Sequence, residues 1–577
     1  MDEFYERPVL NERDKALRYI SKLINKARKN PEDNQSDINE LLEIQKLINQ
    51  KKYGLVWEEH NEMTEEKLKK YIPVFEEVKK KNINNGKGKY NFLLEGDNLY
   101  TLNLLNRTHK GKIDFIYIDP PYNTGNNDFM YNDKFVKKDD TYLHSKWLSF
   151  MKPRLQLAKE LLSPDGIIAV SIDNHEGYQL KLLLDEIFGE DHLAADLHIE
   201  TSAVAGPRRL AAVNGSVVKT AEFIFVYTKG VNTQVMKRPL YDGIQGYDKH
   251  YSKFLDSNTG QLINFTEVLK NTSKISKKFD NYNLRISLPN LNKIVAIDDD
   301  VKEWLFSDKI SKKLFRLSGE FNNKEGIKLI KGINRVDNKY VVFKNNKPYY
   351  AFRYFDRLGM TDDYKPSYME RSIRGNLWKG FSSDGGNLRK EGGVSFKNGK
   401  KPLRLIKQLI KSMTPSDKPI TVLDFFAGSG TTGEAVMQLN KENLGKYNFI
   451  IATNDEVVDI TYKRMLYTNK HNPMNMKYFR VKFVDKKSSS LESDLLKNVR
   501  SLIELQYGIN FEDSSFKLVT KRNEVKSIDL TNITKVFMRS RVHYMMIPEQ
   551  QERYHNAGVE IIDIPENYFS QELQGWV

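Results

Sequence analysis

The sequence contains no cysteine. This absence excludes disulfide bonds, zinc sites built on thiolates and cysteine nucleophiles, and it fits a reducing compartment. The chain also lacks a run of about 18 apolar residues that could cross a membrane, and its first residues lack the basic and apolar pattern of a secretion signal. We therefore expect a cytoplasmic protein with no membrane partner.

Positive charge, by contrast, is abundant. The chain has 91 Lys and Arg residues against 76 Asp and Glu residues, which gives a net charge of +15. A basic surface favours polyanionic partners, because contacts to phosphates release condensed counterions. Charge alone leaves two interpretations equally open: a nucleic-acid-binding protein, and a soluble protein that happens to be rich in lysine.

A chain of 577 residues is too long for one hydrophobic core, so we expect several domains. Helical periodicity from Arg13 to Lys80, with helix starts near Asp37 and Thr64, predicts a small N-terminal helical module. The stretch 82–89 is rich in Asn, Gly and Lys and predicts a linker. A new domain should begin near Tyr90.

Short apolar runs and amphipathic segments then alternate on both sides of a less regular central stretch. Long helices are predicted from Leu143 to Leu162 and from Leu403 to Met413. Buried strands are predicted at 92–94, 113–118, 167–172, 223–227, 420–423 and 449–452. This alternation is typical of a βαβ protein, and the two halves should build one sheet.

Two motifs follow predicted strands, in an unexpected order. A glycine-rich turn begins at Asp424, after the strand at 420–423. Much earlier in the chain, the strand at 113–118 is followed by Asp119, Pro120, Pro121 and Tyr122. In a doubly wound sheet the glycine turn normally comes first, so this order indicates a permuted chain.

The glycine turn suits a nucleotide-like ligand. Gly428, Gly430 and Gly433 have the G-x-G-x-x-G spacing, which lets the backbone bend sharply and approach a ligand. About 20 residues further on, a second strand delivers Asn454 and Glu456, where a carboxylate can hold a ribose diol. The spacing alone fits a dinucleotide equally well, and some matches of this kind are ordinary loops.

The proline turn suits an amine on a flat base. Pro120 and Pro121 lack backbone donors and make a stiff turn at the carboxyl end of a strand, where ligands bind. Asp119 and the Pro120 carbonyl would accept the two amine hydrogens, and Tyr122 would stack on the ring. The alternative is an ordinary proline turn with a surface aspartate.

Taken together, these motifs resemble the permuted, β-class amino methyltransferases of DNA that depend on S-adenosylmethionine. The resemblance spans about residues 92–465 and includes the segments 94–99, 117–125, 172–176 and 424–432. The chain looks most like the modification subunits of type III restriction systems. As a whole it also looks close to a stand-alone clostridial adenine methyltransferase.

The resemblance implies an α/β fold with a doubly wound, Rossmann-like methyltransferase sheet. The expected parts are an N-terminal helical module with linker (1–89), a first core part (90–229), an inserted target recognition domain (230–393), a second core part (394–478) and a small C-terminal domain (479–577).

The resemblance also implies the activity, which is methyl transfer from S-adenosylmethionine to N6 of an adenine flipped out of the duplex. The product would be S-adenosylhomocysteine, and no metal is required. The catalytic residues would be Asp119, Pro120, Pro121 and Tyr122. The cofactor would be held by Asp424, Phe425, Phe426, Ala427, Gly428, Gly430, Thr431, Thr432, Asn454, Glu456, Phe396, Lys401 and Pro402. The segment 396–402 is slightly longer than the family pattern.

Double-stranded DNA with a specific short site is the implied partner. Three basic pairs could contact phosphates as a cluster, although any one of them is more often a solvated face: Arg208 with Arg209, Lys277 with Lys278, and Arg371 with Arg374. The sequence has no G-x-x-x-x-G-K-[ST] motif and no convincing nuclease signature, so restriction, if any, would need a separate subunit. The oligomeric state stays open.

Three other functions compete with this interpretation. An NAD-linked oxidoreductase would use the glycine turn and Glu456, but it leaves the proline turn unexplained. A DNA-binding module without activity would leave Asp119 and Gly428 without a purpose. The same chemistry could act on RNA, on cytosine N4 or on a protein amide. By resemblance, the permuted order favours DNA, and Asp rather than Ser before Pro-Pro-Tyr favours adenine.

Four further residues lie close to these motifs. His144 and Trp147 come at the start of a predicted helix, and Asp173 and Glu176 follow the strand at 167–172. For the first pair, packing or surface exposure is a more common role than ligand contact. For the second pair, a role in the site and solvated loop acids are equally open.

Overall fold

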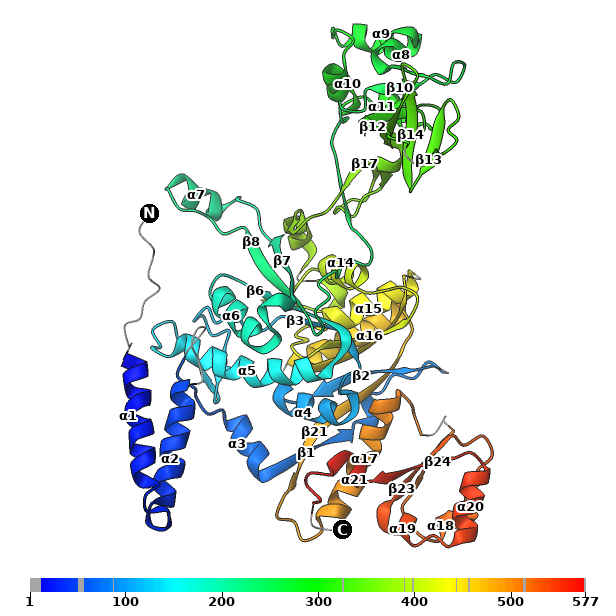
Figure 1. Cartoon of the computed structure of the whole chain (residues 1–577). Helices are drawn as coiled ribbons and strands as arrows, with labels where there is room; N and C mark the ends of the chain where they lie inside the picture. The colour runs from blue at the N-terminus through cyan, green and yellow to red at the C-terminus, as the bar shows by residue number, and fades with distance from the viewer. Residues whose placement is uncertain are drawn as a thin grey trace.

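The computed structural model describes residues 12–49, 57–86, 88–323, 326–388, 390–396, 399–442, 444–454, 457–511 and 515–574. Its centre is a sheet with strand order β1-β21-β2-β20-β19-β3-β6-β8-β7-β18 (Figure 1). The bounds of these strands are β1 Tyr71–Glu77, β2 Tyr90–Glu95, β3 Ile113–Ile118, β6 Leu162–Ile172, β7 Leu193–Glu200, β8 Ala221–Thr228, β18 Leu377–Trp378, β19 Pro419–Asp424, β20 Lys446–Thr453 and β21 Asn475–Asp485. The prediction that the two halves build one sheet is confirmed.

The strand order reverses at the middle of this sheet. The strands β21, β2, β20, β19, β3 and β6 are parallel, and β8 is antiparallel to both of its neighbours. β19 pairs with β3, with Val422 opposite Phe115 and Leu423 opposite Ile116. The chain leaves β19 for β20 on one side and leaves β3 for β6 on the other. Doubly wound sheets bind ligands at such a switch point, beyond the carboxyl ends of the strands.

Helices cover both faces of the sheet. On one face lie α4 (Asn98–His109), α5 (Leu143–Leu161), α6 (Gly177–Phe188) and α17 (Leu491–Tyr507). On the other lie α14 (Leu403–Met413), α15 (Thr431–Lys441) and α16 (Val457–His471). Each buries an apolar stripe at helical spacing, such as Leu405, Ile406 and Leu409 of α14. The predicted bounds of α14 are confirmed, and α5 ends one residue earlier than predicted.

The central stretch forms a separate domain, which Figure 1 shows standing away from the sheet. One part is a sheet of order β11-β10-β12-β15-β14-β13, and β16, β17 and β9 form a second sheet at its base. The strand bounds are β9 Tyr241–Gly243, β10 Lys253–Leu255, β11 Leu262–Asn264, β12 Leu314–Glu320, β13 Ile333–Val336, β14 Lys339–Lys344, β15 Lys347–Arg353, β16 Leu358–Met360 and β17 Tyr368–Ile373. The helices are α8 Phe265–Asn271, α9 Ser273–Asn281, α10 Leu288–Val295, α11 Asp299–Phe306 and α12 Asp308–Ser311. Because β18 returns to the main sheet at Leu377, the insert ends before the predicted residue 393.

Arg374 joins this inserted domain to the core. Its fully buried guanidinium donates to the Asp242 carboxylate at 2.6 Å, to Gln408 of α14 at 2.7 Å and to the Asp362 carbonyl at 3.1 Å. The prediction that Arg374 contacts phosphates is therefore wrong, because these groups already occupy its donors.

Both outer boundaries of the core differ from the prediction. β1 pairs with β21 in the main sheet, so the core begins at Tyr71, before residue 90, and continues past residue 478 to Asp485. The N-terminal hairpin consists of α1 (Glu12–Ala27) and α2 (Pro31–Asn49), and α3 runs over Met63–Lys70. The predicted helix start at Asp37 is wrong, because that residue lies inside α2. The start predicted near Thr64 is confirmed to within one residue, because α3 begins at Met63.

The C-terminal domain is built on three parallel strands, β22 (Phe516–Val519), β23 (Lys535–Arg539) and β24 (Glu560–Ile564). Its helices are α18 Glu524–Ser527, α19 Ser540–Tyr544, α20 Pro548–Asn556 and α21 Glu566–Phe569. It contacts the core through an ion pair between Glu572 and Arg107 of α4. Within the described ranges, no helix has both the length and the apolar character needed to cross a membrane.

Candidate active site

Helix α5 supports the proline turn that follows β3. Trp147 is buried, and its Nε1 donates to the Pro121 carbonyl at 2.7 Å. Next to the turn, Asn123 has φ of 58° and donates to the Leu143 carbonyl at 3.0 Å and to Glu176 Oε1 at 2.5 Å. Trp147 and Glu176 are therefore packed in the protein, and both fix the backbone around the turn.

Asp119 belongs to a cluster of charged side chains. Lys401 Nζ lies 2.9 Å from Asp119 Oδ1 and 3.4 Å from Glu222 Oε2. The Tyr122 hydroxyl donates to Glu222 Oε2 at 2.9 Å, and the Lys401 ammonium lies 4.7 Å from the centre of the Tyr122 ring. The sequence predicts that Lys401 holds the cofactor, but the structure places it against the proline turn.

The prediction from sequence did not include Glu222. It is the second residue of β8, and because β8 is antiparallel, its first residues lie at the same edge of the sheet as the end of β3. The only sequence signal is an acidic residue directly before the apolar run 223–227. That signal is too weak to reveal the contact, because it depends on the direction of β8.

The three charged side chains, Asp119, Glu222 and Lys401, shift one another's pKa. Burial raises the pKa of Asp119, and Lys401 offsets only part of this effect. Burial also acts to raise the pKa of Glu222, but the charge of Lys401, the hydrogen bond from Tyr122 and the charge of Lys219 together outweigh it and the pKa falls. Burial acts to lower the pKa of Lys401, yet the two carboxylates raise it to about 12. Lys401 is thus cationic, Glu222 is ionised, and Asp119 is the carboxylate that takes up a proton more readily.

Asp424 ends β19, next to β3. Its Oδ1 accepts from the Phe426 backbone N–H at 3.0 Å and its Oδ2 accepts from the Thr432 hydroxyl at 2.6 Å. Burial raises the pKa of Asp424 to about 7 and outweighs the two hydrogen bonds, which act to lower it; the charge of Asp119 adds a smaller upward contribution. The electrostatic effect of Asp119 agrees with the pairing of the two strands: the proline turn and the glycine turn meet at one edge of the sheet.

The glycines of the second turn have two different purposes. Gly428 and Gly430 have φ of 49° and 81°, in the left-handed region that favours glycine. A Cβ atom at Gly428 would meet nothing closer than 3.8 Å, so the backbone there faces open space. At Gly433 a Cβ would lie 2.8 Å from Met465 Sδ, which means that this glycine lets α15 pack on α16.

Arg464 of α16 holds the glycine turn from behind. It is fully buried and donates to the Ser429 hydroxyl at 3.0 Å, to the Thr431 hydroxyl at 2.7 Å and to the Glu434 carboxylate at 2.7 Å. The prediction from sequence missed Arg464, because a single arginine in an amphipathic helix gives no signal that distinguishes it from a solvated side chain. On the sheet side, Asn98 Nδ2 donates to the Phe425 carbonyl at 3.1 Å.

The other predicted cofactor residues are spread around this turn. Those buried in the turn and at the start of α15 are Phe425, Ala427, Thr431 and Thr432. Phe426 is half-buried, with its ring 5.9 Å from that of Phe150. Asn454 is exposed and directly follows β20. Pro402 is buried and directly precedes α14, and half-buried Phe396 lies earlier in the same connection. Glu456 lies outside the described residues.

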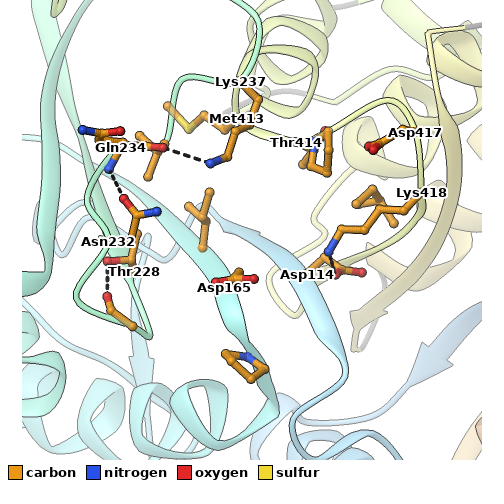
Figure 2. Close-up of a pocket in the computed structure, with 16 residues that line it drawn as sticks. Asp114, Asp165, Thr228, Asn232, Gln234, Lys237, Met413, Thr414, Asp417 and Lys418 are labelled. Carbon is orange, nitrogen blue, oxygen red and sulfur yellow. Dashed lines mark hydrogen bonds and ion pairs between the residues drawn. The ribbon is translucent and has the colours of Figure 1, made fainter.

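A cavity of about 320 Å³ lies elsewhere, and Figure 2 shows the residues around it. It is lined by Asp114 at the start of β3, by Ile420 at the start of β19 and by Asp165, with Lys418 3.6 Å from the Asp114 carboxylate. These are the amino ends of the strands that carry Asp119 and Asp424 at their other ends. The cavity is therefore not part of the predicted site. Across the described residues, no cluster of acidic or histidine side chains is arranged to hold a metal ion.

Of the three predicted basic pairs, Arg208 with Arg209 is the pair in which both side chains are exposed and could contact phosphates together. Lys278 is bound to Asp298 at 2.9 Å and to Asp300 at 2.8 Å. Arg371 stacks on the Tyr241 ring at 3.8 Å, and its partner Arg374 is buried. Arg208 and Arg209 are both exposed in the connection between β7 and β8.

The part of the chain that contains both turns is similar to known proteins. The segments 113–250 and 231–463 match the family described as DNA methylase. The chain is 32% identical to the probable type III restriction-modification enzyme HindVI Mod subunit of Haemophilus influenzae, with coverage of 62% of this chain and 48% of that protein. It is 31% identical to the EcoPI Mod subunit of Escherichia phage P1, with coverage of 65% and 59%. The chain thus spans about half the length of these relatives, and the predicted resemblance to modification subunits is confirmed.

The type II methyltransferase M.KpnI of Klebsiella pneumoniae is 28% identical to the chain, with coverage of 67% of this chain and 90% of that protein. Among solved structures, the PvuII DNA methyltransferase (cytosine-N4-specific) matches with a TM-score of 0.31 and 14% identity, covering 74% of this chain and 98% of that chain. The M1.HpyAVI-SAM complex matches with a TM-score of 0.28 and 14% identity, covering 65% and 98%.

Proposed function

The chain belongs to the DNA methylase family, and from this premise we propose that it transfers a methyl group from S-adenosylmethionine to N6 of adenine in duplex DNA. One observation carries the proposal: Asp119 and Asp424, each at the carboxyl end of a strand, follow two strands that pair with each other. A methyl donor at the glycine turn and an acceptor base at the proline turn would thus share one edge of the sheet.

The residues at the glycine turn fit the proposed methyl donor. Gly428 leaves open space beside the backbone, and the Asp424 carboxyl, with its pKa raised to about 7, would be stabilised in the ionised form by a cationic ligand. S-adenosylmethionine, when bound, supplies an electrophilic methyl group on a cationic sulfur. Asp424 and the backbone of the turn would hold it, and Asn454 and Glu456 are proposed to contact its ribose.

The proline turn would hold the adenine. Asp119 and the Pro120 carbonyl accept the two N6 hydrogens, which concentrates electron density on the nitrogen, and Tyr122 stacks on the ring. Trp147 keeps the Pro121 carbonyl fixed, so the turn is preorganised before the base arrives. After transfer the nitrogen carries a positive charge, and Asp119 is the nearest of these groups able to receive its proton.

Lys401 must give up part of its contact with Asp119 for this to happen. Its ammonium lies 2.9 Å from Asp119 Oδ1, an acceptor atom that the amine needs. Glu222 offers the alternative carboxylate only 3.4 Å away, and it also holds the Tyr122 hydroxyl. We assign Lys401 and Glu222 as positioning residues: the ammonium stays paired with Glu222 while Asp119 turns to the base.

The proposed substrate is a base flipped out of the duplex, because its amine cannot be reached within the stack. The net charge of +15 supports binding to the phosphate backbone, and the inserted domain is proposed to read the site. The relatives named as Mod subunits support a modification role for the chain. Any restriction activity would belong to a separate subunit.

Sequencing of individual DNA molecules from cells that express this chain tests the proposal. We expect N6-methyladenine at one short sequence motif, and no such mark in cells that express the Asp119→Ala variant at equal level. Methylcytosine in place of methyladenine would favour the cytosine N4 alternative. Unmodified DNA despite soluble protein would contradict the proposal.

A further inference from the structure

The connection between β7 and β8 forms an arm, residues 201–220, that projects from the edge of the sheet where the site lies. β7 ends there and β8 begins there, and α7 (Pro207–Val213) lies within the arm. Figure 1 shows α7 extending beyond the sheet on the same side as the inserted domain. The base of the arm is close to the site, because Glu222, two residues beyond it, accepts from the Tyr122 hydroxyl.

The arm exposes aliphatic side chains that have no partner in the protein core. The exposed fractions are 64% for Leu210, 74% for Val213 and 102% for Val217. Single exposed apolar residues are common, but three within eight residues on one projecting element form an apolar surface that water solvates poorly. Such a surface next to a functional site indicates that an apolar partner covers it during function.

Charge identifies the kind of partner. Arg208 and Arg209 are exposed beside Leu210, and Lys219 at the base of the arm pairs with Asp173. An apolar tip flanked by arginines matches duplex DNA, in which the apolar stacked bases lie between two phosphate backbones. An arginine pair also fits DNA better than a hydrophobic protein surface, where the guanidinium groups would have to be desolvated.

We propose that this arm enters the duplex beside the target adenine and that Leu210, Val213 and Val217 fill the space that the extruded base leaves. Arg208 and Arg209 contact the flanking phosphates. Extruding a base costs a few kcal/mol of pairing and stacking, and an apolar side chain in the gap offsets part of that cost by shielding the neighbouring bases from water. The inference rests on the proposed function, which requires a flipped base.

Substitutions in the arm leave the core intact. At its base the arm contacts the core through the Lys219–Asp173 ion pair and the Thr201 hydroxyl, which donates to Glu222 at 3.4 Å. Backbone hydrogen bonds around the three apolar residues are local: the N–H groups of Thr201 and Ser202 donate to the Thr220 carbonyl, and that of Asn214 donates to the Leu210 carbonyl. The triple variant Leu210→Ser, Val213→Ser, Val217→Ser therefore removes apolar surface without opening a cavity. Val231→Ser is the matched control, since Val231 is 79% exposed and follows the opposite end of β8.

The test compares two duplexes that carry the methylated sequence motif. In one the target adenine is paired with thymine, and in the other it faces an abasic site, so that no base pair has to be broken. We expect the triple variant to methylate the paired duplex at least about 10-fold more slowly than the wild type and the abasic duplex within about threefold. With 2-aminopurine at the target position, the wild type should raise its fluorescence and the triple variant should not.

Arg208→Gln with Arg209→Gln should weaken binding to both duplexes alike and lower the slope of log affinity against log salt by about 1 to 2. Equal losses of the triple variant on the two duplexes, or no loss on either, would overturn the inference. A change of oligomeric state in the triple variant would assign the arm to a second copy of the chain and overturn it too. If the wild type methylates no DNA, the proposed function itself fails and the inference falls with it. If the wild type methylates DNA and the arm variants are equally active, the inference fails but the proposed function stands.

Discussion

Asp119 and Asp424 are two buried carboxylates at one edge of the sheet, and their surroundings give them different chemistry. Asp119 faces the Lys401 ammonium, so its negative charge is paired within the protein. Among the residues that the structure describes, Asp424 is hydrogen-bonded by the Thr432 hydroxyl and one backbone N–H, and its pKa is raised to about 7. At neutral pH, Asp424 is therefore close to half protonated and ready to ionise against a cation.

This shift predicts a pH dependence of stability. The folded-state pKa of Asp424 is about 7 against the ordinary 3.8 in the unfolded chain, so the folded state binds the extra proton. The contribution is complete below about pH 4 and is lost as the pH rises through 7. Relative to Asp424→Asn, the wild type should lose up to about 1.4 kcal/mol of unfolding free energy per pH unit in this window. Urea unfolding at pH 5, 6, 7 and 8 measures the difference, and parallel curves for the two proteins would contradict it.

At the scale of elements, α5, α16 and β8 position the two turns from outside. Trp147 of α5 fixes the proline turn, Arg464 of α16 fixes the glycine turn, and Glu222 of β8 binds the Tyr122 hydroxyl. Each contact joins two different elements, over sequence separations of 26, 33 and 100 residues. The positions of the side chains in the site therefore depend on how α5 and α16 pack on the sheet and on the register of β8.

Trp147→Phe tests this support. The variant keeps most of the buried ring but leaves the Pro121 carbonyl without its donor. The loss of one net hydrogen bond, about 1 kcal/mol, should lower kcat about fivefold, while affinity for S-adenosylmethionine stays within twofold. Steady-state kinetics with labelled donor, together with calorimetric binding, separate the two. A loss of cofactor affinity without a change in kcat would contradict the assignment.

The sequence predicted the elements whose signals are local. β3, α5, α14 and β19 have apolar patterns and stop signals that hold in any context, and their bounds differ from the prediction by a few residues at most. β1 was assigned to a helical region, because its segment follows α3 directly and is a strand only through pairing with β21, about 400 residues away. Pro73 is tolerated there because β1 is an edge strand.

The same holds for the site: its two turns could be predicted from the sequence, but the residues that support them could not. The two turns contain proline and glycine, whose backbone restrictions are visible in sequence. Glu222 and Arg464 have no such mark, since their roles depend on strand direction and on helix packing. Lys401 was associated with the site through family resemblance, but its contact with Asp119 became visible only in the fold.

At the scale of the whole molecule, a network of polar contacts joins the inserted domain to the core. Arg374 binds Asp242 at the base of the domain and Gln408 of the core helix α14, and Lys411 of that helix pairs with Asp362 at 2.9 Å. The orientation of the domain relative to the site therefore depends in part on this network around the buried Arg374. If this domain reads DNA, the network aligns recognition with catalysis.

Arg374→Met should separate recognition from cofactor binding. The variant leaves Asp242 and Gln408 without their shared donor and loosens the joint. We expect KM for duplex DNA to rise at least about 10-fold while the dissociation constant of S-adenosylmethionine changes less than twofold. Ile373→Thr, at the exposed neighbouring position, should match the wild type in both measurements. A parallel loss of cofactor affinity would assign Arg374 to general stability instead.

The central claim is that the proline turn and the glycine turn form one site with divided tasks. Purified wild type, Asp119→Asn and Asp424→Ala, incubated with S-adenosylmethionine labelled in its methyl group and with DNA, test it most directly. The wild type should label the DNA. Asp119→Asn should bind S-adenosylmethionine normally but transfer at least about 100-fold more slowly, and Asp424→Ala should lose binding. Transfer by Asp119→Asn at the wild-type rate, or normal cofactor binding by Asp424→Ala, would contradict the account.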